Sequence, residues 1–261
     1  MERNPCSHHY LVILALRNKE RDEITMKSAA TILLVLSGIA GLFVIDRFTK
    51  RFNKLSIFRK QMIYQTMTLI MALLFFIANR LIHSDYRSAL SKSDFDATTE
   101  NFGWLGIKDG TLWSEAVITF LIFPLIITTV VVYFQVIKGS GVTVKRIIAV
   151  MPAAILLSIF NSFTEEIIFR VIGIEGLSGA FTITTLAILS GLWFGIPHYF
   201  GTPGKFPGVL MASFLGWVAA ISILETGGFA VAWGIHFVQD VPIITMMLAV
   251  ANTPSSTKET K

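Results

Sequence analysis

The sequence predicts an all-α protein, a polytopic bundle of seven or eight transmembrane helices. Of its 261 residues, 53% are hydrophobic and 15% are charged, whereas about 25% are charged in a typical soluble domain. The apolar residues also gather in runs long enough to cross a bilayer core, which takes about 20 residues of helix. The single cysteine, Cys6, excludes an internal disulfide and a cysteine-based zinc site.

Seven apolar runs qualify as spans, and the fourth is the longest. They are Ser28–Val44, Gln61–Ile82, Ala116–Val136, Ile148–Gly176, Thr184–Phe200, Val209–Leu224 and Phe229–Val250. We therefore expect an N-terminal segment at 1–27, transmembrane helices and loops at 28–145, a core at 146–251 and a polar tail at 252–261.

The loops between the spans predict an orientation in the membrane. Loop Asp46–Lys60 carries six basic residues and one acidic residue, and the loop with Lys138, Lys145 and Arg146 carries no acid. Loop Ser84–Glu115 leans acidic, with Asp85, Asp94, Asp96, Glu100 and Asp109. Because cytoplasmic loops are enriched in Lys and Arg, the two basic loops and, with seven spans, the tail are expected in the cytoplasm. The net charge of +5 is then a membrane signature and not a nucleic-acid surface.

The N-terminal segment fits this orientation poorly. Its basic residues would lie outside, and its apolar run Tyr10–Leu16 is too short to span. These residues are Arg3, Arg17, Lys19, Arg21 and Lys27. Two explanations stay open: translation begins at Met26, or a shallow additional segment makes the count eight. A cleaved signal peptide is disfavoured, because no small-x-small site follows the run.

Ionisable residues lie inside the predicted spans of the C-terminal half. Each costs about 2.5–3.5 kcal/mol at the centre of a lipid-facing helix, so these side chains should meet one another or line a wet cavity. Glu166 and Arg170 are four apart, as are His236 and Asp240, so each pair shares a helix face. At about 1.5 Å of rise per residue, the groups fall at similar depth. The set is Glu165, Glu166, Arg170, His198, His236 and Asp240.

Each piece also has a purely structural interpretation. A Glu–Arg pair can be a clamp, a membrane histidine often only packs, and Asp240 could be a hydrogen-bond partner between helices. The convergence of acids and imidazoles at one depth favours a functional site.

Three segments resemble a known family. Glu165-Glu166-Ile167-Ile168-Phe169-Arg170 reads as EExxxR, Phe194-Gly195-Ile196-Pro197-His198 as FxxxH, and His236-Phe237-Val238-Gln239-Asp240 as HxxxN/D. In this order, each within a span, they resemble the CPBP family of CAAX proteases and bacteriocin-processing proteins, also called ABI proteins, over about Met151–Val250. The type II CAAX prenyl endopeptidases of that family have Asn where this chain has Asp240.

The resemblance implies an intramembrane endopeptidase in which a glutamate activates water. It implies Glu165 as general base, His198 as a holder of the water and His236 as stabiliser of the oxyanion. Asp240 would orient His236, or donate to the oxyanion if protonated, and Glu166 with Arg170 would position the site. Adjacent helical residues point about 100° apart, so Glu165 and Glu166 should play different parts.

Several alternatives remain at this level. Two histidines with carboxylates could hold zinc, although no HExxH helix is present; we expect no cofactor, with zinc left open. There is no GxGD segment of the kind found in aspartyl intramembrane proteases. An ion-coupled transporter usually shows an internal repeat, which is missing here, and a non-catalytic immunity or scaffold protein is the third possibility.

The expected partners are membrane lipids and a membrane-associated protein or peptide, without nucleic acid. Whether that substrate is prenylated stays open. The expected location is an integral, multi-pass position, in the cell membrane if the source is prokaryotic.

Overall fold

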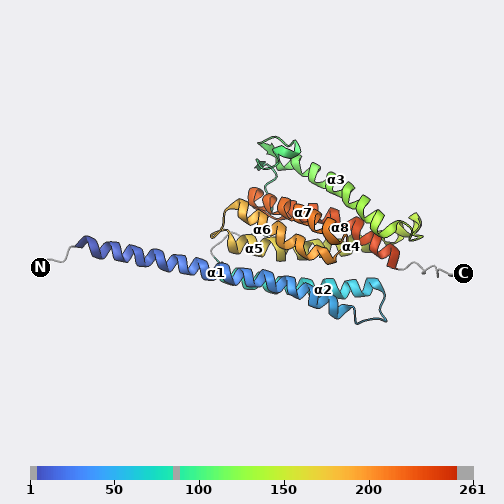
Figure 1. The fold of residues 1–261 in the computed structure, drawn as a ribbon, viewed down its shortest axis with the longest axis horizontal. Helices are drawn as coiled ribbons and strands as arrows, with labels where there is room; N and C mark the ends of the chain where they lie inside the picture. The colour runs from blue at the N-terminus through green and yellow to red at the C-terminus, as the bar shows by residue number, and fades with distance from the viewer. Residues whose placement is uncertain (1–4, 85–88, 252–261) are drawn as a thin grey trace.

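The computed structural model describes residues 5–84 and 89–251, with side chains from residue 17 onward. Within them the chain forms eight α-helices and one two-residue β-ladder, Thr98–Thr99 (β1) with Thr111–Leu112 (β2). Figure 1 shows the helices as one elongated bundle. The helices are α1 Pro5–Thr49, α2 Ile57–Ile82, α3 Trp113–Val132, α4 Val144–Glu166, α5 Ile172–Leu177, α6 Ile183–Gly195, α7 Lys205–Thr226 and α8 Ala230–Ala251.

Seven helical segments of the described chain are long and apolar enough to cross a membrane. They coincide with the seven predicted spans, so the all-α polytopic class is confirmed. The fourth segment, Val144–Leu177, combines α4, a π-helical turn at Ile167–Val171 and α5. The fifth, Ile183–Phe200, ends in a 3₁₀ turn. The chain is therefore an integral, multi-pass membrane protein.

Local sequence sets several of the helix boundaries. The hydroxyls of Ser56, Thr143 and Thr182 accept hydrogen bonds from backbone N–H groups three residues later, which caps α2, α4 and α6. At the other end of α7, Gly227 takes a left-handed conformation with φ 66°, which glycine adopts without steric cost.

The first helix differs from the prediction. The expected span Ser28–Val44 lies inside a helix that runs continuously from Pro5 to Thr49. A proline is well tolerated at a helix start, and the Leu-, Ala-, Arg-, Lys- and Glu-rich sequence that follows favours helix. The run Tyr10–Leu16 is thus part of this one helix and not a separate segment.

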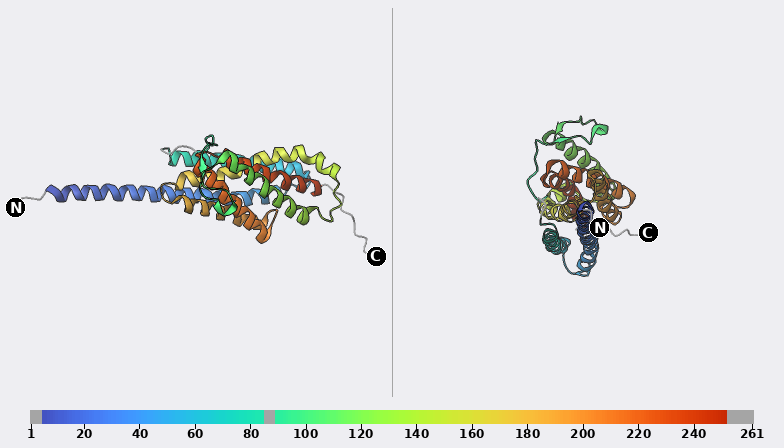
Figure 2. Two further views of the ribbon diagram at one scale, coloured as in Figure 1. Left: turned by 90° about the horizontal axis from the view of Figure 1, so that it is seen from above. Right: turned by 90° about the vertical axis from the view of Figure 1, so that its left-hand side faces the viewer.

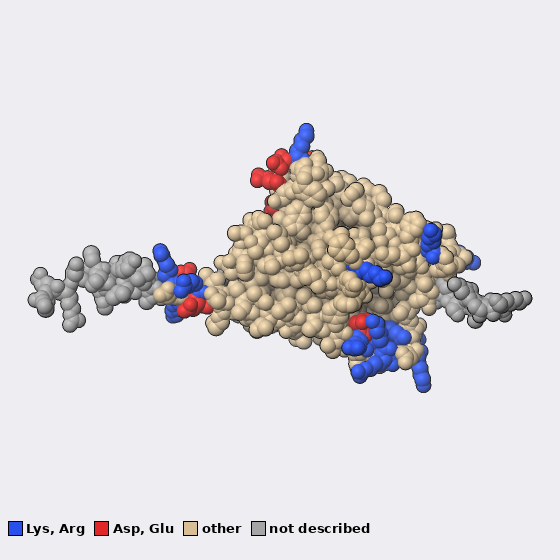
Figure 3. Space-filling model, viewed as in Figure 1, with Lys and Arg blue, Asp and Glu red and all other residues tan. Residues whose placement is uncertain are grey.

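Charged side chains gather toward the two ends of the bundle in Figure 3, on either side of a band with very few of them. The predicted basic loop Asp46–Lys60 lies at the end opposite the β-ladder (Figure 1). Asp85, Arg3 and the tail 252–261 lie outside the described residues, and Cys6 lies outside the described side chains. The inside-outside orientation stays a prediction.

The centre of the bundle is built by α4, α6, α7 and α8, as the end view in Figure 2 shows. Helix α6 packs on α7 and α4 packs on α8, whereas α3 packs mainly against α8. Glycines let α6 and α7 approach closely: an added Cβ on Gly216 would lie 3.1 Å from the Cα of Gly191, and one on Gly195 would clash with Ser213. Small residues at such a contact are typical of membrane helices.

Candidate active site

The end of α4 and the π-helical turn after it carry the predicted Glu–Arg pair. Arg170 Nη1 lies 3.0 Å from Glu166 Oε1, and both side chains are fully buried. The guanidinium also stacks over the ring of Phe194, 3.7 Å from its centroid. This confirms the predicted pairing. π-Helical turns are rare and frequently lie at functional sites.

His236 of α8 connects three carboxylates. Its Nδ1 lies 2.7 Å from Glu166 Oε1, and its Nε2 lies 3.5 Å from Glu165 Oε2 and 3.7 Å from Asp240 Oδ1. With Nδ1–H donating to Glu166, the ring is held by the Glu–Arg pair and presents Nε2 to the other two acids. The structure thus brings together five of the six predicted site residues, all but His198, in one connected cluster.

Two polar residues that the sequence reasoning missed complete this cluster. Asn161, one turn before Glu165 on α4, donates from Nδ2 to Asp240 Oδ2 over 3.1 Å. Its Oδ1 accepts from Gln65 Nε2 of α2 over 2.9 Å. Both are uncharged, so a search for ionisable groups in the spans passed over them.

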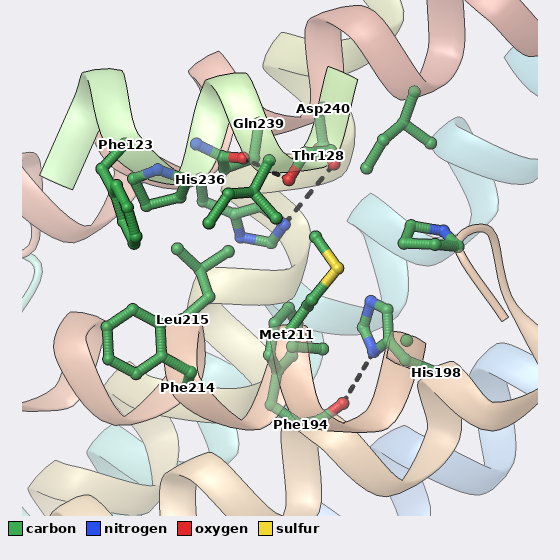
Figure 4. Close-up of a pocket in the computed structure, with 16 residues that line it drawn as sticks. Phe123, Thr128, Phe194, His198, Met211, Phe214, Leu215, His236, Gln239 and Asp240 are labelled. Atoms are coloured by element: carbon green, nitrogen blue, oxygen red, sulfur yellow. Dashed lines mark hydrogen bonds and ion pairs between the residues drawn. The ribbon is translucent and has the colours of Figure 1, made fainter. Parts of the chain in front are cut away.

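His198 belongs to the opposite wall of an apolar cavity, shown in Figure 4. Its Nδ1 lies 2.7 Å from the carbonyl oxygen of Phe194. The ring of Phe194 contacts His198 and His236, with centroid distances of 4.5 and 5.3 Å. His198 has no hydrogen bond or ion pair to Glu165 among the described residues. The two predicted histidines therefore approach the same space from different helices.

The cavity encloses about 650 Å³, counting the space at its mouth, and is lined by residues of α3, α7 and α8 together with Phe194, His198 and Pro203. Three ionisable residues line it: His198, His236 and Asp240. Glu165 does not line it, and its side chain is 14% exposed. Glu165 is connected to the cavity through His236, which contacts both.

One wall of the cavity is α3, which contains Pro124. Proline lacks an N–H and bends a helix. Gln239 of α8 faces this point: with its amide oxygen toward the N–H of Leu125 at 2.9 Å, its NH₂ group donates to the Pro124 carbonyl at 3.0 Å and to the Thr128 hydroxyl at 2.7 Å. Gln239 thus ties the proline region of α3 to the helix that carries His236 and Asp240.

Two carboxylate oxygens of the cluster are buried without a hydrogen bond inside the described part of the chain, Glu165 Oε2 and Glu166 Oε2. Buried acceptors are normally satisfied, and exceptions often have a catalytic role. No group of three or more His, Cys, Asp and Glu side chains among the described residues has a geometry that would hold a metal ion.

The fold and the cluster define a class of protein, a multi-pass helical membrane protein with buried acids and imidazoles beside an apolar cavity. Residues 147–242 match the family model described as type II CAAX prenyl endopeptidase Rce1-like, which confirms the resemblance to the CPBP family. No curated protein and no solved structure matches the chain. The matched segment contains all six predicted site residues, and the similarity indicates a CAAX-type intramembrane endopeptidase.

Proposed function

We propose that the protein hydrolyses a peptide bond of a membrane-associated protein or peptide, using a water activated by Glu165. The observation that carries this proposal is the buried, unsatisfied Glu165 Oε2 placed 3.5 Å from His236 Nε2, with His236 lining the cavity. A carbonyl bound against His236 would be within one water of Glu165, which is the reach required of a general base.

In this proposal Glu165 takes a proton from water while the water oxygen adds to the carbonyl carbon. His236, protonated on both ring nitrogens, donates from Nε2–H to the resulting oxyanion, and His198 helps to hold the water from the opposite wall. Collapse of the tetrahedral intermediate breaks the C–N bond, and Glu165 returns the proton to the leaving amine. Asp240 orients the ring of His236, and Arg170 balances the charge of Glu166.

The lining of the cavity supports a substrate with an apolar portion. Phe123, Ile127, Met211, Phe214 and Leu215 all face it, and a chain of carbon atoms next to the scissile bond would bury apolar surface there. A prenylated CAAX-type substrate fits this chemistry, and so does any other peptide with a long apolar anchor.

The direct test is cleavage by purified protein reconstituted in lipid vesicles. The substrates are matched fluorogenic peptides that end in CAAX, with the cysteine either prenylated or unmodified, and mass spectrometry identifies the cleaved bond. We expect cleavage of the prenylated peptide, and no cleavage by a Glu165→Gln preparation. Proton-coupled solute uptake without cleavage of either peptide would instead identify a transporter.

Chelation separates the glutamic from the metal mechanism. We expect activity to survive prolonged treatment with a strong zinc chelator, because the proposed base is a carboxylate acting on water. Loss of activity that zinc alone restores would establish the metal mechanism and refute the role given to Glu165.

A further inference from the structure

Asp240 is held from two sides in the cluster. Its Oδ1 lies 3.7 Å from His236 Nε2, and its Oδ2 accepts the 3.1 Å hydrogen bond from Asn161. A carboxylate on a helix can rotate about its terminal torsion, which is broad and roughly two-fold. The hydrogen bond from Asn161 fixes that rotation and so decides which oxygen faces His236.

The orientation of Asn161 is itself fixed. Gln65 Nε2 donates to Asn161 Oδ1 over 2.9 Å, which directs the NH₂ group of Asn161 toward Asp240. The reverse orientation would place Asn161 Oδ1 against Asp240 Oδ2, two acceptors face to face when the acid is ionised. Gln65 is 3% exposed; its Nε2 makes this hydrogen bond, whereas its Oε1 has no hydrogen-bond partner among the described residues.

We propose that Gln65 and Asn161 form a relay that positions Asp240, and through it His236, for catalysis. The proposal rests on the proposed hydrolysis. It also assigns an active-site role to α2, which lies outside the matched segment 147–242. Asn161 and Gln65 are positioning residues, because neither lines the cavity; Asn161 holds Asp240 and also interacts with Glu165.

The structure supplies a matched control on the same helix as Gln65. Asn79 of α2 donates from Nδ2 to Glu175 Oε2 over 3.3 Å, so it is a buried asparagine that, like the half-buried Asn161, faces a buried carboxylate. Within the described part of the chain, it makes no hydrogen bond with His236 or Asp240. Asn79→Leu therefore reproduces the loss of an asparagine–carboxylate hydrogen bond away from the site.

The first measurement compares kcat and KM of three variants in vesicles. We expect Asn161→Leu to lower kcat about tenfold to a hundredfold, the range for a hydrogen bond to a charged group, with little change in KM. Gln65→Leu should lower kcat less, and Asn79→Leu should leave kcat unchanged. Equal losses of kcat in Asn161→Leu and Asn79→Leu would show a merely structural role and overturn the proposal.

The second measurement is a rescue. Asn161→Asp places two carboxylates at a distance of a hydrogen bond and should lower kcat about a hundredfold or more. Adding Asp240→Asn restores one donor facing one acceptor, in reversed order, and should recover at least about tenfold of that loss. A double variant no more active than Asn161→Asp alone would refute the relay.

The third measurement does not use activity. The chain has five histidines, so imidazole NMR signals of isotope-labelled protein can be assigned with His236→Gln. Asn161→Leu should shift the signal of His236, and Asn79→Leu should leave it unchanged. If Asn161→Leu shifts the His236 signal but the wild-type protein cleaves no peptide, the relay is supported and the proposed function is contradicted. An unchanged His236 signal in Asn161→Leu would refute the relay itself.

Discussion

The span Val144–Leu177 carries two buried acidic sites that differ in how completely they are satisfied. Around Glu166, two carboxylate oxygens lack hydrogen bonds among the described residues, and the cluster borders a cavity. Nine residues later, Glu175 is 3% exposed. It accepts from the N–H of Ala89 at 2.6 Å and from Asn79 at 3.3 Å, and Arg80 lies 3.6 Å away.

The contacts of Glu175 indicate that this residue has a structural role. Its partners belong to α2 and to the chain after it, so the carboxylate ties the start of the long loop to the end of α5. His83 continues this outer cluster: its Nε2 lies 2.8 Å from the hydroxyl of Thr31 on α1. A buried acid whose oxygens both accept hydrogen bonds, and which does not line the cavity beside His236, stabilises the fold.

Burial of a charge alone therefore does not identify a catalytic site in this membrane protein. Unsatisfied carboxylate oxygens next to a cavity mark the inner cluster, whereas both oxygens of Glu175 in the outer cluster accept hydrogen bonds. Substitutions in the inner cluster should therefore lower catalysis, whereas substitutions in the outer cluster should lower stability alone.

The largest effect is expected from Glu165→Gln, which is nearly isosteric. Removing a general base typically costs 10²–10⁴-fold in rate, so we expect kcat to fall by about a thousandfold. The thermal midpoint in detergent should stay close to that of the wild type, because Glu165 Oε2 makes no hydrogen bond among the described residues. Near-normal turnover in this variant would remove Glu165 as the base.

Glu166→Gln should lower both stability and activity. It leaves the buried Arg170 without its counter-ion, which typically costs about 3–5 kcal/mol, and it weakens the contact with His236 Nδ1. Thermal unfolding and peptide cleavage measure the two effects. Adding Arg170→Met should recover part of the stability and little of the activity, because the contact with His236 is still altered. Full recovery of both would show that Glu166 serves only Arg170.

Glu175→Gln should lower stability and leave catalysis intact. The amide loses hydrogen bonds to a charged acceptor, each worth about 1.5–3 kcal/mol, while the inner cluster is untouched. The expected result is a lower thermal midpoint with kcat within about twofold of the wild type. A selective loss of kcat at unchanged stability would erase the distinction between the two clusters.

The smallest effect concerns acid sensitivity at the outer cluster. Burial first, and then the nearby charge of Lys27, lower the pKa of His83 from its ordinary value of 6.5. The unfolded chain therefore binds this proton more readily, and the stability that His83 contributes is lost as the pH falls below about 6.5 toward its folded pKa. Between pH 7.5 and 5.5, His83→Gln should lose less of its thermal midpoint than the wild type. A steeper loss of thermal midpoint in the variant than in the wild type would contradict the lowered pKa of His83.

The helical class and the positions of the spans could be read from the sequence, because lipid permits only a few backbone solutions and demands long apolar runs. The same rule made Glu165, Glu166, Arg170, His198, His236 and Asp240 conspicuous, since ionisable groups in spans are rare. The Glu166–Arg170 pair followed from helical spacing alone. The N-terminal boundary of α1 did not, because charged residues continue a helix as readily as apolar ones.

Which helices meet could be known only from the three-dimensional structure. Glu165 and Glu166 are adjacent in the chain, yet their contacts with His236, which is 71 and 70 residues away, depend on the packing of α4 against α8. Gln65 and Asn161 carry no charge and match no motif, so nothing in the sequence separates them from other polar residues; their hydrogen bond exists because α2 lies beside α4. The local sequence determines where apolar helices form and which residues are costly to place in lipid. The partners of a buried polar group are instead set by contacts between segments far apart in the chain.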